Sequence, residues 1–256
     1  MTDSPLKVWL EQDGKLLRLR LNRPKANIVD AEMIGALQQA FGQYAGQVGL
    51  RAVLLDAEGP HFSFGASVEE HMPDSCAAML RGLHRLVERM LEFPLPILVA
   101  INGQCLGGGL EVAAAASRLF ASGSAVFGQP EIKLAVFAPA ASCLLPERIG
   151  ASAAEDLLLS GRSVKAEEAL AMGLVDQLDE DPAAAAETYF EKQLAGLSAS
   201  TLRYAVQAVR SDRLDRIKTK LVQVEALYLD ELMSTHDAVE GLTAFLEKRP
   251  AKWEER

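Results

Sequence analysis

The chain has 256 residues, 49% of them hydrophobic, and it carries a formal net charge of −9. This length and composition suffice for one large domain, or a core domain with a smaller appendage, that buries its core without disulfides or structural metals. The acidic balance argues against a nucleic-acid-binding protein, because such a protein needs a basic surface, and the most basic stretch, Arg210–Lys220, also contains Asp212 and Asp215.

The N-terminal half alternates between strand and helix patterns. Alternating apolar and polar residues at Lys7–Gln12 and Lys15–Leu21 flank Asp13–Gly14, which predicts a β-hairpin. Asp30 is placed to cap a helix whose apolar residues fall on one face, namely Met33, Ile34, Leu37 and Phe41. Further strands are expected at Ala52–Asp56, Ile97–Ile101, Leu119–Ala121 and Ala125–Gly128, and a second helix over about Ser75–Glu92.

The C-terminal half has a different pattern, which is nearly all helical from about Pro139 onward. One short apolar stretch, Gly173–Leu178, interrupts it, and an acidic run then leads into long helices that continue through Lys248. Strands that alternate with helices, followed by a helical tail, predict an α/β core with an α-helical C-terminal part.

Neither the cysteines nor the histidines have the spacing of a metal site. The cysteines are far apart without a CxxC pair, and the histidines lack the spacing that places two ligands on one helix face. We therefore expect free buried thiols, loop or surface histidines and no metal, with His71 alone considered as part of a pocket wall. The residues concerned are Cys76, Cys105, Cys143, His61, His71, His84 and His236.

The sequence also bears on localisation. The N-terminal residues MTDSPLKVW contain no apolar signal core. No apolar run reaches the roughly 18 residues that span a bilayer. These patterns predict a cytoplasmic protein.

The segment LVAINGQCLGGGLEVAAAA, residues 98–116, carries the most functional information. Its apolar beginning predicts a buried strand, and Gly107–Gly109 then leads into a helical stretch with Glu111 in the first turn. A glycine-rich helix N-terminus exposes backbone N–H groups, which favour an anion or a developing oxyanion. The triplet matches neither the GxGxxG dinucleotide motif nor a Walker loop. Close packing of the helix against the strand is the alternative interpretation.

Two further segments are expected near this one, because loops that follow strands gather at one edge of an α/β sheet. They are Phe62–Ser67 and Gly128–Glu131. A helix N-terminus favours the ionised form of Glu111, whereas apolar neighbours would favour neutral Glu131 if it is buried. Two carboxyl groups in different environments can divide the duties of base and acid. Solvated loop residues are the alternative for both.

Six sequence segments, and the order in which they follow one another along the chain, resemble the crotonase, or enoyl-CoA hydratase/isomerase, superfamily. This resemblance covers nearly the whole chain and implies a spiral of ββα units, residues 1–195, that holds an acyl-CoA site. Residues 196–256 would form a C-terminal helical region that drives assembly into a homotrimer or a dimer of trimers. The segments are RPKANIVDAEM (23–33), FSFGAS (62–67), INGQCLGGGLEVA (101–113), FGQPEIKL (127–134), LLPERIG (144–150) and AFLEKR (244–249).

The resemblance also implies roles for individual residues. The backbone N–H groups of Ala66 and Gly108 would form an oxyanion hole for the thioester carbonyl. Glu111 and Glu131 would be the two catalytic carboxylates of the hydratase branch, whereas isomerases of the family often keep only the residue that matches Glu131. The residues implied to contact CoA are Lys25, Ala26, Ala66, Ser67, Val68, Gly108, Phe245 and Lys248, the last two often reaching it from a neighbouring subunit.

Two segments depart from the common family pattern, Gly65–Val68 and Ala138–Cys143. With their flanks, HFSFGASVEEHMP and VFAPAASCLLP, they are most similar to members that hydrate cyclohexa-1,5-diene-1-carbonyl-CoA to 6-hydroxycyclohex-1-ene-1-carbonyl-CoA in anaerobic benzoyl-CoA degradation. We expect Phe137–Leu145 to wall the acyl pocket, with a helix buried only for packing as the alternative. The resemblance implies no cofactor besides the CoA of the substrate, and no nucleic-acid or membrane partner. Alternative functions are a general enoyl-CoA hydratase of β-oxidation, a double-bond isomerase and a non-catalytic RNA-binding homologue.

Overall fold

The computed structural model describes residues 4–256, so the first three residues of the predicted core lie outside the described part of the chain. The larger sheet has the strand order β1-β2-β3-β4-β6-β9 and the smaller sheet has the order β5-β7-β8. The strands are β1 (Leu6–Glu11), β2 (Leu16–Leu21), β3 (Ala52–Ala57), β4 (Ile97–Ile101), β5 (Gln104–Leu106), β6 (Arg118–Ala121), β7 (Val126–Gly128), β8 (Ser163–Lys165) and β9 (Gln177–Leu178).

Helices cover the larger sheet and extend beyond it. The α-helices are α1 (Ala31–Tyr44), α2 (Cys76–Glu92), α3 (Gly108–Ala114), α4 (Pro139–Ile149), α5 (Ala151–Ser160), α6 (Ala166–Ala171), α7 (Pro182–Tyr189), α8 (Ala199–Ala226) and α9 (His236–Leu246). Short 3₁₀ helices cover Glu69–His71, Pro130–Leu134 and Leu232–Ser234, and π-helical turns cover Phe190–Leu194 and Leu227–Glu231. None of the helices in residues 4–256 is long and apolar enough to cross a membrane.

The predicted N-terminal elements are confirmed. Strands β1 and β2 pair antiparallel around the predicted turn, with Leu6 opposite Leu21. The carboxylate of Asp30 accepts a hydrogen bond from the N–H of Met33 at 2.9 Å and caps α1, as the sequence predicts. The apolar face of α1 is buried, so the predicted helical periodicity and the predicted N-cap are both found in the structure.

The chain winds as a spiral that alternates between the two sheets. Strand β4 of the larger sheet is followed by β5 of the smaller one, and β6 is followed by β7. Earlier in the chain, β3 leads to Ser63, which forms a bridge with Cys105 of β5, and Ala66 forms a bridge with Val29. The turns that begin with β4 and with β6 each add one strand to each sheet, which confirms the expected ββα spiral.

Three strands were not predicted, and the shortest of them is the two-residue β9, which lies in the apolar stretch Gly173–Leu178. Strand β5 lies within the segment between β4 and the glycine triplet, and β8 lies in the region that the sequence predicts as helical. Each has only three residues, which is too short for a period-two pattern to be read. Their pairing with β7 defines them instead, parallel for β5 and antiparallel for β8.

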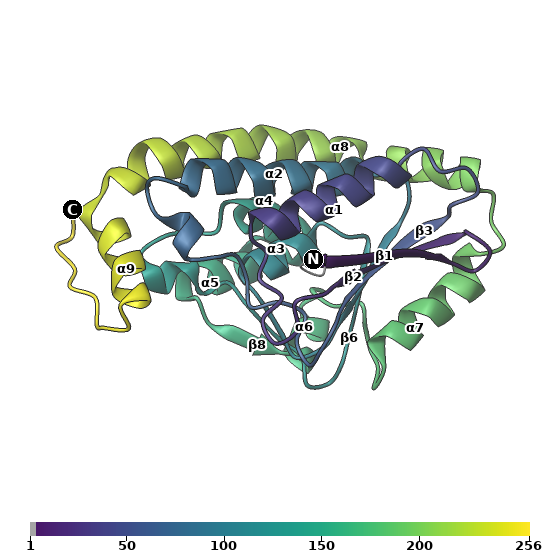
Figure 1. Cartoon of the computed structure of the whole chain (residues 1–256), viewed down its shortest axis with the longest axis horizontal. Coiled ribbons are helices and arrows are strands. Elements are labelled where there is room, and N and C mark those ends of the chain that lie inside the picture. The colour runs from purple at the N-terminus through teal and green to yellow at the C-terminus, as the bar shows by residue number, and fades with distance from the viewer. Residues whose placement is uncertain (1–3) are drawn as a thin grey trace.

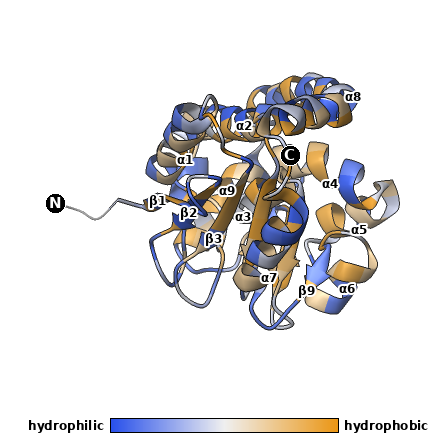
Figure 2. Ribbon diagram, turned by 90° about the vertical axis from the view of Figure 1, so that its right-hand side faces the viewer, coloured by the Kyte–Doolittle hydropathy of each residue, from blue (hydrophilic) through white to orange (hydrophobic). Residues whose placement is uncertain are grey.

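Figure 1 shows α8 lying along α2 on the outside of the molecule, with α9 at one end and α7 at the other. Arg210 of α8 is buried, and its guanidinium donates hydrogen bonds to the carbonyls of Leu91 and Phe93 at 2.9 and 3.0 Å. These carbonyls end α2, where no further helical turn supplies donors, so Arg210 joins the two helices. In Figure 2 the strands are mostly hydrophobic, as expected for a sheet buried on both faces.

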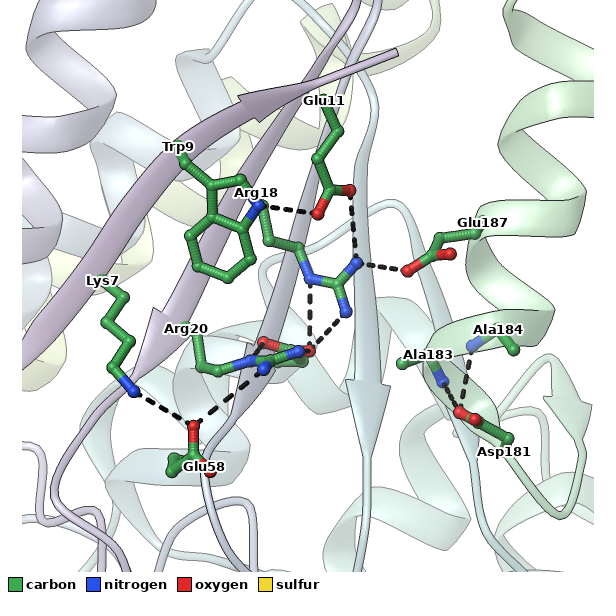
Figure 3. A network of polar contacts seen from close by, with 11 residues as sticks. Lys7, Trp9, Glu11, Arg18, Arg20, Glu58, Asp181, Ala183, Ala184 and Glu187 are labelled. Atoms are coloured by element: carbon green, nitrogen blue, oxygen red, sulfur yellow. Dashed lines mark hydrogen bonds and ion pairs between the residues drawn. The ribbon is translucent and has the colours of Figure 1, made fainter.

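A network of charged residues ties the N-terminal hairpin to the rest of the sheet (Figure 3). The carboxylate of Asp56 on β3 accepts hydrogen bonds from Arg18 at 2.6 Å and Arg20 at 2.7 Å, both on β2. Arg18 is only 3% exposed and also pairs with Glu11 and with Glu187 of α7. The charges that line this part of the molecule are thus paired with one another.

We expect Asp56→Asn to lower the free energy of unfolding by about 3 kcal/mol, because it leaves a buried guanidinium without its main counter-charge. Chemical denaturation of the purified protein measures this. Lys7→Met is the control, since Lys7 pairs with Glu58 at the exposed surface at 3.3 Å and its loss should cost about 0.5 kcal/mol or less. Equal effects of the two variants would contradict a structural role for the buried network.

Candidate active site

A cavity of about 370 Å³ lies where successive turns of the spiral end. The segment after β3 contributes Ala66, the segment after β5 contributes Gly108 and Glu111, and the segment after β7 contributes Glu131. The parallel pairing of β5 with β7, and the bridge from Ser63 to β5, bring these segments together. The structure thus gathers in one cavity the four residues that sequence analysis assigns to catalysis. This volume suits a small acyl group.

Ala66 and Gly108 both line this cavity. An ideal Cβ built on Gly108 would lie 3.1 Å from the nitrogen of Ala66, so the two peptides face each other closely. Gly108 is the first residue of α3, where a helix has no carbonyl of its own for the N–H. In residues 4–256, neither N–H donates a hydrogen bond to a protein acceptor. Two free donors this close together at a cavity wall can hold an oxyanion.

Ser63 fixes the loop that carries Ala66. Its side chain is fully buried, and its hydroxyl donates to the carbonyl of Asn27 at 2.8 Å and accepts from the N–H of Gly65 at 3.1 Å. Its own carbonyl accepts from the N–H of Leu106 at 3.0 Å. One buried serine therefore ties the loop to the turns of the spiral before and after it.

Glu111 lines the cavity and is 3% exposed. Its carboxylate accepts a hydrogen bond from the N–H of Ala141 at 2.8 Å. Helix α4 begins at Pro139 without a side-chain cap, so Glu111 supplies from another element the acceptor that the first turn of α4 needs. This contact fixes the carboxylate and explains how α4 is joined to the site.

Glu131 lies against the glycine triplet. An ideal Cβ on Gly107 would lie 2.6 Å from one carboxylate oxygen of Glu131, so only glycine allows this approach. Gly107 also has φ +48°, which favours glycine. The side-chain amide of the buried Gln129 lies 3.0 and 3.2 Å from the two carboxylate oxygens and, with its nitrogen on that side, donates to both. Sequence analysis places Gln129 within the segment Gly128–Glu131 expected at the site but assigns it no role.

Both carboxyl groups hold their protons more tightly than an exposed glutamate. Burial raises the pKa of Glu111 to about 7, although the N–H groups of Ala141 and Ala140 oppose the rise. Burial and then the nearby charge of Glu111 raise the pKa of Glu131 to about 8. Desolvation thus outweighs the helix N-terminus that favours ionised Glu111, although the pKa of Glu111 stays below that of Glu131. The raised pKa of Glu131 agrees with the expectation that its surroundings favour the neutral, protonated carboxyl group.

We expect a narrow bell-shaped pH profile of kcat/KM. Chemistry that needs one carboxylate and one carboxylic acid is lost below the lower apparent pKa, where both groups are protonated, and above the higher one, where both are ionised. From the two raised pKa values the maximum should fall between about pH 7 and pH 8, as a property of the pair. Steady-state rates from pH 5 to 10 measure it. A plateau down to pH 5 would contradict a paired acid and base.

The residues implied to contact CoA divide into two groups. Val68 and Phe245 line the cavity, together with Ala66 and Gly108. Phe245 belongs to α9 of the same chain and is half exposed, so this wall is present without a neighbouring subunit. The others do not line it; they are Lys25, Ala26, Ser67 and Lys248.

Apolar side chains from distant elements complete the cavity. Leu80 and Leu83 come from α2, and Leu242 comes from α9. Within the predicted wall, Phe137 and the residues up to Pro139 line the cavity, whereas those beyond it lie behind the wall in α4. Sequence analysis did not identify the leucines, because they fall on helix faces that resemble any buried face.

Comparison with known proteins is consistent with this geometry. The Enoyl-CoA hydratase/isomerase family matches residues 11–256. The chain is 68% identical over 253 residues to the cyclohexa-1,5-dienecarbonyl-CoA hydratase of Thauera aromatica, covering 99% of this chain and 98% of that protein. It is 32% identical over 250 residues to a probable enoyl-CoA hydratase of Bacillus subtilis, covering 94% of this chain and 96% of that protein.

Solved structures give the same result. An enoyl-CoA hydratase/isomerase from Pseudoalteromonas atlantica T6c superimposes with a TM-score of 0.86 at 29% identity, covering 97% of this chain and 99% of that chain. The chain therefore belongs to the enoyl-CoA hydratase/isomerase family.

Proposed function

We propose that the protein hydrates cyclohexa-1,5-diene-1-carbonyl-CoA to 6-hydroxycyclohex-1-ene-1-carbonyl-CoA. The observation that carries the reaction type is one cavity in which two carboxyl groups with raised pKa values, Glu111 and Glu131, lie with the two free N–H groups of Ala66 and Gly108. The choice of the cyclic diene rests on the 68% identity to a hydratase of that name.

The oxyanion hole activates the substrate. The thioester carbonyl accepts hydrogen bonds from the N–H groups of Ala66 and Gly108, which draws electrons out of the conjugated ring. Glu111, as the carboxylate, takes a proton from a water whose oxygen then bonds to the β-carbon, C2 of the ring. The electron pair of the C1–C2 double bond moves toward the carbonyl and gives a dienolate. Each donor of an oxyanion hole typically contributes about 3 kcal/mol to such a step.

Protonation completes the addition. Glu131, as the carboxylic acid, delivers its proton to C5 at the far end of the dienolate, and the remaining double bond settles between C1 and C6. The hydroxyl on C2 and the new hydrogen on C5 are then in a 1,4 relation across the ring. Renumbering the ring gives the 6-hydroxy-1-ene. The proton from the water replaces the one that Glu131 loses, so the pair returns to its starting charge.

Two carboxyl groups favour hydration over isomerisation, because moving a double bond needs one group that removes and returns a proton. A general enoyl-CoA hydratase would use the same four groups and differ in the pocket walls. The acidic net charge of −9 weighs against the RNA-binding alternative. The reaction needs no metal, flavin or nicotinamide, since the thioester supplies the activation. We also propose a cytoplasmic homotrimer or dimer of trimers, following the family resemblance.

The test is a spectrophotometric and mass assay of the purified protein with the cyclic diene beside crotonyl-CoA. The proposal predicts the gain of one water on the cyclic diene, with a kcat/KM at least about tenfold higher than on crotonyl-CoA. The reverse preference would reassign the enzyme to straight-chain acyl groups and leave the carboxylate roles intact. Activity on neither would contradict the proposed function.

A further inference from the structure

His71 is a polar group that the reaction described above does not use. It ends the 3₁₀ helix that follows the oxyanion loop, and its side chain lines the acyl cavity beside Val68 and Leu80. Most other residues of the cavity wall are apolar, with Leu83 and Val136 among them, and Lys133 and the two glutamates are the charged exceptions. His71 is partly buried, and its imidazole brings a hydrogen-bonding group to this wall.

One hydrogen bond determines which ring nitrogen is free. Nδ1 of His71 lies 2.7 Å from the carbonyl oxygen of Ser67. A carbonyl only accepts, so Nδ1 carries the proton and donates. Burial lowers the pKa of His71, which keeps the imidazole neutral. Nε2 is then an acceptor with a lone pair, and in residues 4–256 it has no hydrogen-bond partner.

An acceptor in an acyl pocket can take a hydrogen bond from an occupant that carries a donor. The ring of the cyclic diene carries only carbon and hydrogen and offers none. The attacking water and the hydroxyl group of the product each carry an O–H. We propose that Nε2 of His71 accepts a hydrogen bond from the hydroxyl of the bound hydroxyacyl thioester, and from the water that becomes this hydroxyl. His71 is therefore a specificity-determining and water-positioning residue; this role rests on the proposed hydratase function.

The same side chain has a second, structural contact, and the two must be separated. By donating to Ser67, the imidazole also anchors the loop that carries Ala66. Two substitutions each preserve one contact. In His71→Asn the amide nitrogen reaches the place of Nδ1 and keeps the anchor, but nothing reaches the place of Nε2. In His71→Gln the longer amide reaches the place of Nε2 but loses the anchor.

The experiment compares the affinity for the alcohol with that for the diene. Initial rates of hydration give KM for cyclohexa-1,5-diene-1-carbonyl-CoA, and product inhibition gives Ki for 6-hydroxycyclohex-1-ene-1-carbonyl-CoA. We expect His71→Asn to raise Ki about tenfold while KM changes less than about twofold, as for the loss of one hydrogen bond to the alcohol alone. His71→Gln should keep the ratio of Ki to KM within about threefold of the unsubstituted protein. His236→Gln, a change at the surface, is the control.

The possible results separate the two proposals. If Asn leaves the ratio unchanged and Gln alters it, the anchor to Ser67 is the whole role of His71 and the acceptor role is wrong. If both constants rise together in both variants, His71 only shapes the cavity, and the proposal is again overturned. An unsubstituted protein that hydrates neither the diene nor crotonyl-CoA would contradict the hydratase function itself, and with it the hydroxyl that His71 would bind.

Discussion

Glu131→Gln is expected to lower kcat/KM for hydration of the cyclic dienoyl thioester by about 10³-fold, with KM changed less than about threefold. A glutamine matches the shape of the carboxylic acid but carries no proton that it can transfer, so the dienolate is not protonated. Glu111→Gln should have a similar effect, because an amide does not take a proton from water. The double variant should be little worse than either single variant, since the two groups act as a unit.

Stability and a matched control make this test decisive. The amide oxygen of a glutamine at position 111 still accepts from the N–H of Ala141, so α4 keeps its first turn and the free energy of unfolding should fall by about 1 kcal/mol or less. Glu167→Gln makes the same change on the exposed first turn of α6, outside the cavity, and should leave kcat/KM unchanged. Near-normal rates for both Glu111→Gln and Glu131→Gln would overturn the assignment of acid and base.

Gly108→Ala is expected to lower kcat by about 10² to 10³-fold, as much as the loss of one oxyanion-hole donor, because the added Cβ keeps the thioester oxygen away from the N–H groups. The added Cβ would lie 3.1 Å from the nitrogen and from the Cβ of Ala66, in the space where the thioester oxygen must sit. Gly108 does not have a positive φ, so its own backbone conformation suits alanine, and only a small shift of the loop at Ala66 is needed to admit the Cβ. The loss should therefore appear in catalysis while the protein still folds.

Gly35→Ala provides the matched control. Gly35 lies within α1, and an ideal Cβ there has no neighbour within 4 Å. We expect unchanged kcat and a gain of about 1 kcal/mol in the free energy of unfolding, because alanine in a helix loses less backbone entropy on folding than glycine. A Gly108→Ala protein with full kcat would show that the thioester oxygen binds elsewhere.

The large elements were predictable because each has its own local signal. The capping residue Asp30 and the apolar face of α1 independently predict the same helix, and Asp13–Gly14 predicts the hairpin turn. Strands β5 and β8 were not predictable, because three residues give no readable period and their pairing partner β7 is distant along the chain. The same short strands bring the segments of the site together. Local sequence patterns therefore predict which segments form the site but not how they are arranged in space.

The catalytic segments were predictable from the motif, whereas their electrostatics were not. Sequence spacing places Glu111 in the first turn of a helix, which alone favours the carboxylate. The structure encloses it beneath α4, a helix that begins 28 residues later, and this enclosure raises its pKa. The leucines of the pocket and the orientation of His71 depend on packing between elements distant in sequence, which no local pattern encodes.

The position of deuterium in the product tests the account most directly. Hydration of cyclohexa-1,5-diene-1-carbonyl-CoA in D₂O, followed by NMR of the product, locates the added hydrogen. Attack at the β-carbon and protonation at the far end of a dienolate predict one deuterium at C3 of 6-hydroxycyclohex-1-ene-1-carbonyl-CoA, across the ring from the hydroxyl. Deuterium at C5, beside the hydroxyl-bearing carbon, would mean direct addition to the other double bond and would contradict a dienolate held by Ala66 and Gly108.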